Sequence, residues 1–106
     1  MLLGNYFHNI NKNYKNFSFS GISFDTKSIK KNNIFFAIKG NSIDGNKFIP
    51  KAIKKGSKII VTERKTNQFQ NGILYIHTNN ARKLLAEIAF KIYNKKPKNL
   101  IAVTGT

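Results

Sequence analysis

Three short apolar runs, separated by helical or polar segments, constrain the fold of this chain more than any other feature. IFFAI (34–38), KIIVTE (58–63) and ILYIHT (73–78) are rich in β-branched and aromatic residues and are bounded by polar residues or glycine. This pattern is typical of strands, and we expect the first run to be covered on both faces and the second to be buried. KFIPKAIKK (47–55), between the first two runs, places its apolar residues on one helical face. Strand, helix and strand with short links predict a parallel βαβ unit with a right-handed crossover.

Two further segments complete the predicted domain. A short strand is expected over 18–24, with Gly21 as a possible bulge. A longer helix is expected over 80–94, capped by Asn79 or Asn80, because its apolar residues recur at spacings of three and four. The sequence therefore predicts a small three-layer α/β domain with a mixed, partly parallel sheet and flanking helices.

Capping and loop residues mark the ends of the first predicted helix. Asn46 is expected to cap its N-terminus, Pro50 fits only its first turn, and Gly56 ends it. The loop GNSIDGN (40–46) contains two glycines, which are expected to give backbone freedom and close approach to a ligand. Residues 64–72 are expected to form a surface loop.

Length and composition exclude several classes of protein. A chain of 106 residues and 12.1 kDa holds one small domain at most. It has no cysteine, which excludes a disulfide scaffold and a thiolate metal site. No apolar run approaches the roughly 18–20 residues of a membrane span, and the N-terminus does not resemble a signal peptide. We therefore expect a soluble cytoplasmic protein.

The charge is strongly positive, with 19 Lys and Arg against 4 Asp and Glu, a net +15. This surplus is compatible with a nucleic acid or with a small ligand that carries phosphate. Only Arg64 and Arg82 are arginines, however, and Lys, Asn and Ile are all used heavily. That bias favours an A/T-rich genome as the source of the charge, because readers of nucleic acid more often use arginine.

Residues that could perform catalysis are sparse. His8 and His77 have no acidic or cysteine partner at ligand spacing, and Glu63 and Glu87 are too scattered to work as an acid–base pair. We therefore expect no catalytic residue and no metal ligand in these residues.

The last residues combine a predicted buried strand with a Thr-Gly turn. A buried strand over 100–103 runs directly into Thr104, Gly105 and Thr106, as a phosphate-binding loop does where it leaves its strand. The lysine and hydroxyl that would complete such a loop do not follow. Taken alone, these residues leave two interpretations open, the start of a phosphate-binding loop or an ordinary turn after a strand, and a buried strand at this place predicts an N-terminal fragment of a larger protein.

A run of matched spacings carries a resemblance to a known family. GISFDTKSIKKNNIFFAIKGNSIDGNKFIPKAIKKGSKIIV (21–61) resembles the N-terminal domain of the Mur ligases, and the resemblance extends over residues 20–106. The matching positions are Asp25-Thr26-Lys27, Asn32 to Ala37, Gly40, Asp44-Gly45, Phe48-Ile49, Ala52, Gly56-Ser57, Asn80-Ala81-Arg82, Ala89, Tyr93, Pro97 and Val103 to Thr106.

The resemblance implies a three-domain, ATP-dependent enzyme of peptidoglycan synthesis that forms a peptide bond. Such ligases phosphorylate a carboxylate of the substrate, and an amine then attacks the acyl phosphate. The N-terminal domain holds the UDP end of UDP-N-acetylmuramoyl-dipeptide, while ATP and Mg²⁺ belong to the central domain. The resemblance thus implies a substrate-binding domain over 1–98 and the first strand and truncated phosphate-binding loop of the ATP-binding domain over 99–106. This fragment alone is therefore expected to be inactive, to act as a monomer and to bind neither nucleic acid nor membrane.

Within the family, the Val-Thr-Gly-Thr ending favours the ligases that add the third residue of the stem peptide, either diaminopimelate or lysine. Two alternatives stay open. The first is the sibling ligase that adds D-alanyl-D-alanine, which tends to read Thr-Gly-Ser or Thr-Gly-Asn here. The second is a module of another class, either a basic nucleic-acid-binding domain or a non-catalytic interaction domain.

The resemblance also assigns residues to the substrate. Phe24 and Thr26 match positions that contact the UDP-sugar, and a hydroxyl with backbone N–H groups suits a diphosphate. Asn41, Ser42 and Ile43 match a loop that contacts the uridine, where an amide offers both a donor and an acceptor. For Asn41 and Ser42, an ordinary polar turn is the alternative.

Four other residues near these positions have structural interpretations. Asp25 is expected to cap its loop, because a carboxylate repels a diphosphate, and Asp44 is expected to bond its own backbone in a tight turn. Lys27 stands where the family has arginine, which keeps the charge and loses a bidentate contact. Asn33 replaces the usual aspartate of a turn, and its role is expected to be structural.

Overall fold

The computed structural model describes residues 1–8, 10–39 and 44–94. These residues form short 3₁₀ helices, one five-stranded sheet and two α-helices. In chain order the elements are η1 (Leu3–Asn5), η2 (Lys12–Tyr14), β1 (Gly21–Ser23), β2 (Asn33–Phe36), η3 (Gly45–Phe48), α1 (Ile49–Lys54), β3 (Ile59–Thr62), β4 (Phe69–Gln70), β5 (Ile73–His77) and α2 (Ala81–Asn94).

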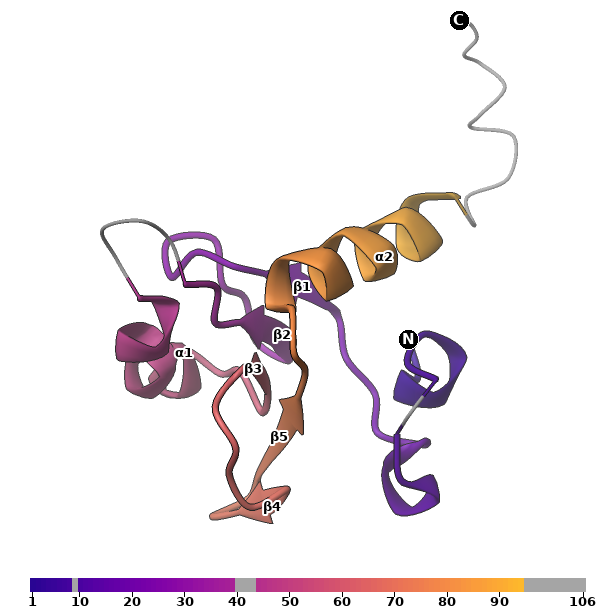
Figure 1. The fold of residues 1–106 in the computed structure, drawn as a ribbon, viewed down its shortest axis with the longest axis horizontal. Helices are drawn as coiled ribbons and strands as arrows, with labels where there is room; N and C mark the ends of the chain where they lie inside the picture. Colours follow the sequence, from indigo (N-terminus) through magenta and orange to yellow (C-terminus); the bar gives the residue numbers. More distant parts are fainter. Residues whose placement is uncertain (9, 40–43, 95–106) are drawn as a thin grey trace, which may run out of the picture.

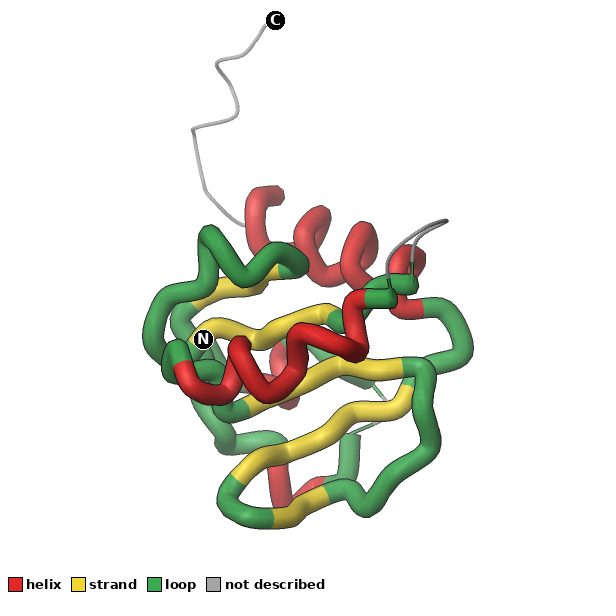
Figure 2. Tube along the Cα trace, turned by 90° about the vertical axis from the view of Figure 1, so that its left-hand side faces the viewer, coloured by secondary structure: helices red, strands yellow, loops and turns green. Residues whose placement is uncertain are grey.

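The sheet is mixed and mostly parallel, as predicted. Its strand order is β1-β2-β3-β5-β4, and the strands lie side by side in Figure 2. The first four strands in this order are parallel. β4 pairs with β5 in the opposite direction, across a turn in which Asn71 and Gly72 both have positive φ. The carboxyl ends of β1, β2, β3 and β5 therefore lie along one edge of the sheet.

The two faces of the sheet carry different layers, which confirms the predicted three-layer arrangement. Alternate residues of each central strand point to opposite faces. Phe35 and Ile60 pack with Ala52 of α1 on one face, while Phe36 and Val61 pack on the other. In Figure 1, α1 lies to the left of the sheet and the N-terminal segment to the right, with α2 across the top.

The described residues that precede β1 contribute to the core. Leu3, Tyr6, Phe7 and Phe19 are buried in the same cluster as Ile88 of α2. Their burial removes apolar surface from water, so the segment has a reason to stay on the sheet.

The first strand is shorter than predicted. It begins at Gly21, which pairs in regular parallel register with Asn33, so the expected bulge is wrong. Ser18 instead forms an antiparallel bridge with Leu2, beside the N-terminus. Residues 18–20 thus follow the N-terminal segment rather than the sheet.

The first helix begins differently from the prediction. Asp44, and not Asn46, is the N-cap, because its carboxylate accepts from the Asn46 N–H at 2.9 Å and so starts η3. α1 follows directly, with Pro50 in its first turn as expected. Gly56 comes just after the C-cap Lys55 and has φ +113°, a conformation that glycine adopts without strain, so the predicted stop is confirmed.

None of the helices in the described ranges is long and apolar enough to cross a membrane. The strand predicted over 100–103 and the expected phosphate loop at Thr104, Gly105 and Thr106 lie outside the described residues.

Candidate functional site

The loop after β1 carries two of the predicted substrate contacts. Phe24 directly follows the strand and is 64% exposed, and Thr26 is half-buried. Asp25 between them turns inward on its own loop. Its carboxylate accepts from the Lys27 N–H at 2.6 Å, and its carbonyl oxygen accepts from the Ser23 hydroxyl at 2.9 Å. Asp25 is therefore a loop cap, as the sequence predicts.

A hollow of about 430 Å³ lies between this loop and α2. Its walls are mostly apolar and come from the end of β1, the loop and one side of the helix. The lining residues are Ile22, Ser23, Phe24, Ser28, Arg82, Leu85, Ala86, Ala89 and Tyr93. The hollow contains Phe24 but not Thr26, so only one of the two predicted contacts of this loop reaches it.

Arg82 is a residue of this hollow that sequence reasoning did not assign to the substrate. It lies in the first turn of α2, and its side chain is exposed. A guanidinium is a strong partner for phosphate oxygens because it can donate two parallel hydrogen bonds. The available signal was its position two residues after the cap residue Asn80, but the distance in sequence from Phe24 hid their proximity.

The second predicted contact region, Asn41, Ser42 and Ile43, lies outside the described residues. Its two flanks are described. Lys39, three residues after the end of β2, forms an antiparallel bridge with Asp44. β2 itself pairs with β1 in parallel. The flanks of this segment and the Phe24 loop thus both follow carboxyl ends of adjacent strands, at the edge where α/β sheets commonly bind ligands.

A polar network holds the flank at Asp44. The buried Thr62 hydroxyl, at the end of β3, donates to the Asn46 side-chain oxygen at 2.5 Å. Asn46 in turn donates from its side-chain amide to the Asp44 carboxylate at 2.7 Å. Arg64 lies 3.6 Å from the other carboxylate oxygen of Asp44. The network ties η3 to the carboxyl end of β3.

The same contacts set the charge state of Asp44. The backbone N–H of Asn46, followed by its side-chain amide, holds the pKa of the Asp44 carboxyl below its ordinary value. Arg64 and Lys39 lower it further. Asp44 bonds its own turn, as predicted, and its carboxylate stays ionised.

Gly45 approaches the chain itself and not a ligand. A Cβ at this position would stand 2.6 Å from the Ile38 carbonyl oxygen and 2.7 Å from the Ile38 nitrogen. The Gly45 N–H also donates to that carbonyl at 2.9 Å. Close approach is thus required here, although the sequence prediction assigned it to a ligand.

Two acceptors fix the start of α2. The predicted cap Asn80 accepts from the Lys83 N–H at 3.0 Å. Glu63, which follows β3, accepts from the Ala81 N–H at 2.8 Å, and a carboxylate there also complements the helix dipole.

Asn33, at the start of β2, is structural as expected, since its side chain accepts from the Lys30 N–H and donates to the Ser20 hydroxyl, both at 3.0 Å.

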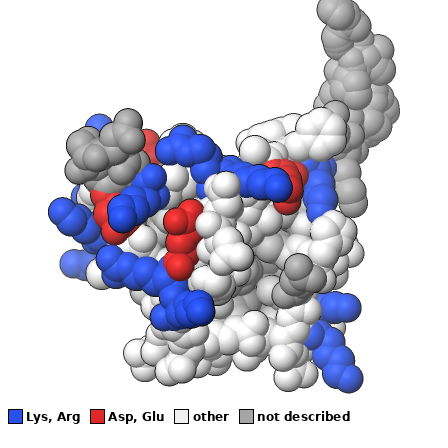
Figure 3. Space-filling model, viewed as in Figure 1, with Lys and Arg blue, Asp and Glu red and all other residues white. Residues whose placement is uncertain are grey.

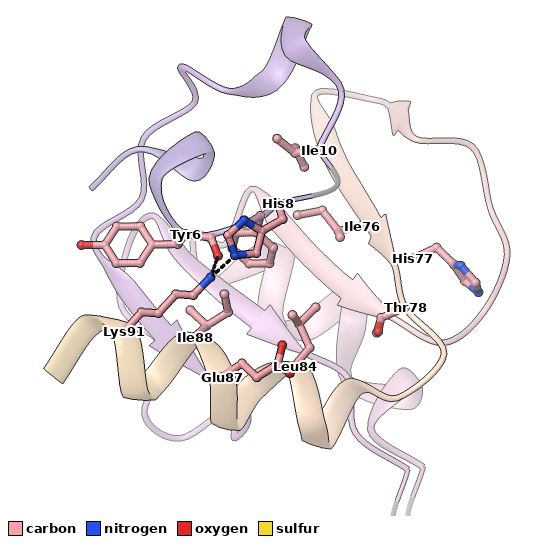
Figure 4. A pocket seen from close by; sticks show the side chains of 11 residues that line it. Tyr6, His8, Ile10, Ile76, His77, Thr78, Leu84, Glu87, Ile88 and Lys91 are labelled. Atoms are coloured by element: carbon pink, nitrogen blue, oxygen red, sulfur yellow. Dashed lines mark hydrogen bonds between the residues drawn. The ribbon is translucent and has the colours of Figure 1, made fainter. Parts of the chain in front are cut away.

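A second, smaller hollow of about 180 Å³ lies between the N-terminal segment and α2 (Figure 4). Lys91 bridges one side of it, donating to the Tyr6 carbonyl at 3.0 Å and to Nε2 of His8 at 2.8 Å. His77 is exposed at its rim. The inner wall is core surface, so we interpret these polar contacts as a tie between two elements and not as a reaction centre.

The described residues contain no group of three or more His, Asp or Glu side chains that could hold a metal ion. Mg²⁺ is therefore not assigned to this part of the chain. The positive charges do not form one band on the face in Figure 3, where Lys and Arg lie in separate groups beside α1, along α2 and near the N-terminal segment.

Comparisons with known proteins agree with the resemblance. The sequence profile "Mur ligase family, catalytic domain" matches residues 18–95. A UDP-N-acetylmuramoyl-L-alanyl-D-glutamate--2,6-diaminopimelate ligase from Rickettsia prowazekii is 41% identical over 93% of this chain and 20% of its own length. The enzyme of the same name from Clostridium tetani is 48% identical over 80% of this chain and 18% of its own length. The chain thus spans about a fifth of the curated relatives that it matches.

Solved structures give the same fold. A MurF ligase from Thermotoga maritima, in complex with ADP, has a TM-score of 0.57 and 26% identity over 70% of this chain and 17% of its own. MurF from Acinetobacter baumannii has a TM-score of 0.59 over 73% of this chain and 16% of its own; at 18% identity it supports the fold alone. With a family profile that covers most of its length, this chain belongs to the Mur ligase family.

Proposed function

We propose that this chain binds the UDP end of UDP-N-acetylmuramoyl-L-alanyl-D-glutamate at the carboxyl edge of its sheet. The observation that carries the proposal is the hollow beside β1, which has Phe24 on one wall and Arg82 on the other. An aromatic ring can pack against a base, and a guanidinium can pair with a diphosphate, so the two walls suit the two ends of a uridine diphosphate.

The residues assigned from the resemblance complete the proposed site. Thr26 offers a hydroxyl two residues after Phe24 in the same loop, outside the hollow, and Asn41, Ser42 and Ile43 come between Lys39 and Asp44 in sequence. We assign the diphosphate to Thr26 and Arg82 and the uridine to Phe24 and the 41–43 segment.

The proposed activity of the whole protein follows the names of the relatives. We propose an ATP-dependent ligase that adds 2,6-diaminopimelate as the third residue of the peptidoglycan stem peptide, because the matched relatives carry that name at 37–48% identity. The MurF structures are less similar in sequence, which disfavours the sibling ligase. ATP and Mg²⁺ would supply phosphoryl transfer outside the described residues, in a cytoplasmic enzyme that acts as a monomer.

Isothermal titration calorimetry of the intact protein with UDP-N-acetylmuramoyl-L-alanyl-D-glutamate tests the proposal. We expect binding that weakens about tenfold or more in Phe24→Ala and in Arg82→Ala, because each removes one wall contact. Phe69→Ala is the matched control, since Phe69 is an exposed aromatic residue on β4, at the opposite edge of the sheet. Equal affinities in all four proteins, or no binding by the unaltered protein, would contradict the proposal.

A further inference from the structure

The loop 24–28 is shaped by hydrogen bonds among its own residues, and its two ends are anchored by the buried Ser23 and Ile29. Its internal hydrogen bonds converge on Asp25, whose carbonyl oxygen accepts from the hydroxyls of Ser23 and Ser28 at 2.9 and 3.2 Å. The two hydroxyl oxygens are also 2.9 Å apart. All of these partners belong to the loop or to the last residue of β1. They set the shape of the loop, and a hydrogen bond between Thr26 and another element needs a donor from outside it.

Lys55 provides that donor. Its Nζ donates to the Thr26 carbonyl oxygen at 2.6 Å, across 29 residues of sequence. Among the described residues, no other hydrogen bond joins Thr26 to another element, so this bond connects Thr26 to the end of α1. A charged donor makes the bond stronger than a neutral one, although exposure to water reduces its net contribution.

The backbone that carries Lys55 is held firmly. Lys55 is the C-cap of α1, and its N–H donates to the carbonyls of Lys51 and Ala52, both at 3.1 Å. Ala52 is 0% exposed in the core beneath the helix. The next carbonyl, of Gly56, accepts from the Asn32 N–H at 2.9 Å. The side chain of Lys55 therefore extends from a fixed base to the loop.

We propose that Lys55 is a positioning residue for the UDP-sugar site, acting through the backbone of Thr26 and not by contact with the ligand. This proposal rests on the proposed function, in which Thr26 contacts the diphosphate. Holding the Thr26 carbonyl in place keeps its hydroxyl and the neighbouring N–H groups oriented before the ligand arrives. Without Lys55, binding would have to order the loop, which lowers affinity for the ground state and the transition state alike.

Steady-state kinetics of the intact ligase on UDP-N-acetylmuramoyl-L-alanyl-D-glutamate test the proposal with three variants. Lys55→Met removes the ammonium and keeps the apolar stem, and Lys55→Arg restores a charged donor. Lys54→Met is the matched control, since Lys54 is also exposed, is adjacent in sequence and makes no hydrogen bond through its side chain to any described residue.

We expect Lys55→Met to raise KM about three- to tenfold with kcat unchanged, the range that one hydrogen bond corresponds to. Lys54→Met should match the unaltered protein, and Lys55→Arg should recover most of the loss. Hydrogen exchange without ligand should show faster exchange of amides 26–28 in Lys55→Met only.

The outcomes separate this proposal from the proposed function. No binding or turnover of this substrate by the unaltered protein overturns the proposed function and this proposal with it. Normal turnover with equal KM in Lys55→Met and Lys54→Met overturns this proposal alone. A raised KM with unchanged exchange of amides 26–28 would place Lys55 in direct contact with the ligand, which also contradicts a positioning role.

Discussion

At the scale of single residues, Asp44 makes several of the contacts that hold the carboxyl edge of the sheet. Its carboxylate caps η3 and accepts from the Asn46 amide, its second oxygen lies near Arg64, and its backbone bridges to Lys39. These contacts all hold one end of the segment that the resemblance assigns to uridine. Ionisation of Asp44 is thus coupled to the shape of the sheet edge.

The lowered pKa of Asp44 predicts a loss of stability in acid. A carboxyl whose folded pKa is lowered stabilises the fold above its unfolded pKa, about 3.9, and this contribution is lost as the pH falls through the folded pKa. The urea concentration at the midpoint of unfolding should therefore decrease as the pH is lowered below about 4. Asp44→Asn should show a shallower fall, while Glu87→Gln on the exposed side of α2 should follow the unaltered protein. Identical slopes in all three would contradict the assignment.

The buried bond between Thr62 and Asn46 gives a second prediction at this scale. The two residues are 1% and 7% exposed. Thr62→Val keeps the shape but leaves the Asn46 oxygen without its donor, so we expect a loss of about 1–3 kcal/mol in the free energy of unfolding. Thr66→Val, on the exposed loop beyond β3, should change it by less than about 0.5 kcal/mol. Urea unfolding measures both, and a silent Thr62→Val would contradict the network.

At the scale of elements, the sequence predicts those whose local pattern and final environment agree. The apolar runs of β2, β3 and β5 are buried on both faces, and α2 shows its periodicity and its Asn80 cap directly. β4 is missed because two residues carry no periodicity, although the positive φ at Asn71 and Gly72 fits the hairpin turn that this dipeptide favours.

The other errors arise from contacts distant in sequence. Phe19 packs with Tyr6, ring to ring at 5.6 Å, and so stays beside the N-terminus rather than extending β1. Asn46 has the residue type of a helix cap, but its side-chain oxygen accepts a hydrogen bond from Thr62, sixteen residues away in sequence. In the candidate site, Phe24 was predicted from the sequence and lines the hollow beside β1. Arg82 lines the same hollow only because the fold places α2 there.

A substitution at Gly45 should displace the whole of η3. Because its missing Cβ lies against the Ile38 backbone, Gly45→Ala must push η3 away from the end of β2, at a cost of about 1–3 kcal/mol or more. Gly21→Ala is the control, since the nearest atom to its added Cβ is a side-chain amide nitrogen at 3.3 Å. Thermal unfolding should separate the two variants, and equal midpoints would show that η3 can shift freely.

A substitution at Lys91 tests whether its hydrogen bonds hold the N-terminal segment against α2. Lys91→Met removes the bonds to Tyr6 and His8, so amides 3–8 should exchange faster by about three- to tenfold through local opening. Lys83→Met, on the same helix, should leave them unchanged. If both variants protect these amides equally, apolar burial alone holds the segment.

At the scale of the whole molecule, the proposed binding site lies at the carboxyl edge of the sheet. Both faces are covered, and the Phe24 loop, the Asp44 turn and the start of α2 all follow carboxyl ends of parallel strands. The net charge of +15 is compatible with a phosphate-bearing ligand but does not by itself select this edge, because the positive charges are spread over the chain.

Hydrogen exchange of the intact protein, with and without UDP-N-acetylmuramoyl-L-alanyl-D-glutamate, tests the binding site most directly. The account predicts slower exchange on binding at amides 24–28 and in the first turns of α2, with no change in the β4–β5 hairpin around Asn71 and Gly72. Protection confined to that hairpin or to the N-terminal segment, with the Phe24 loop unchanged, would contradict it.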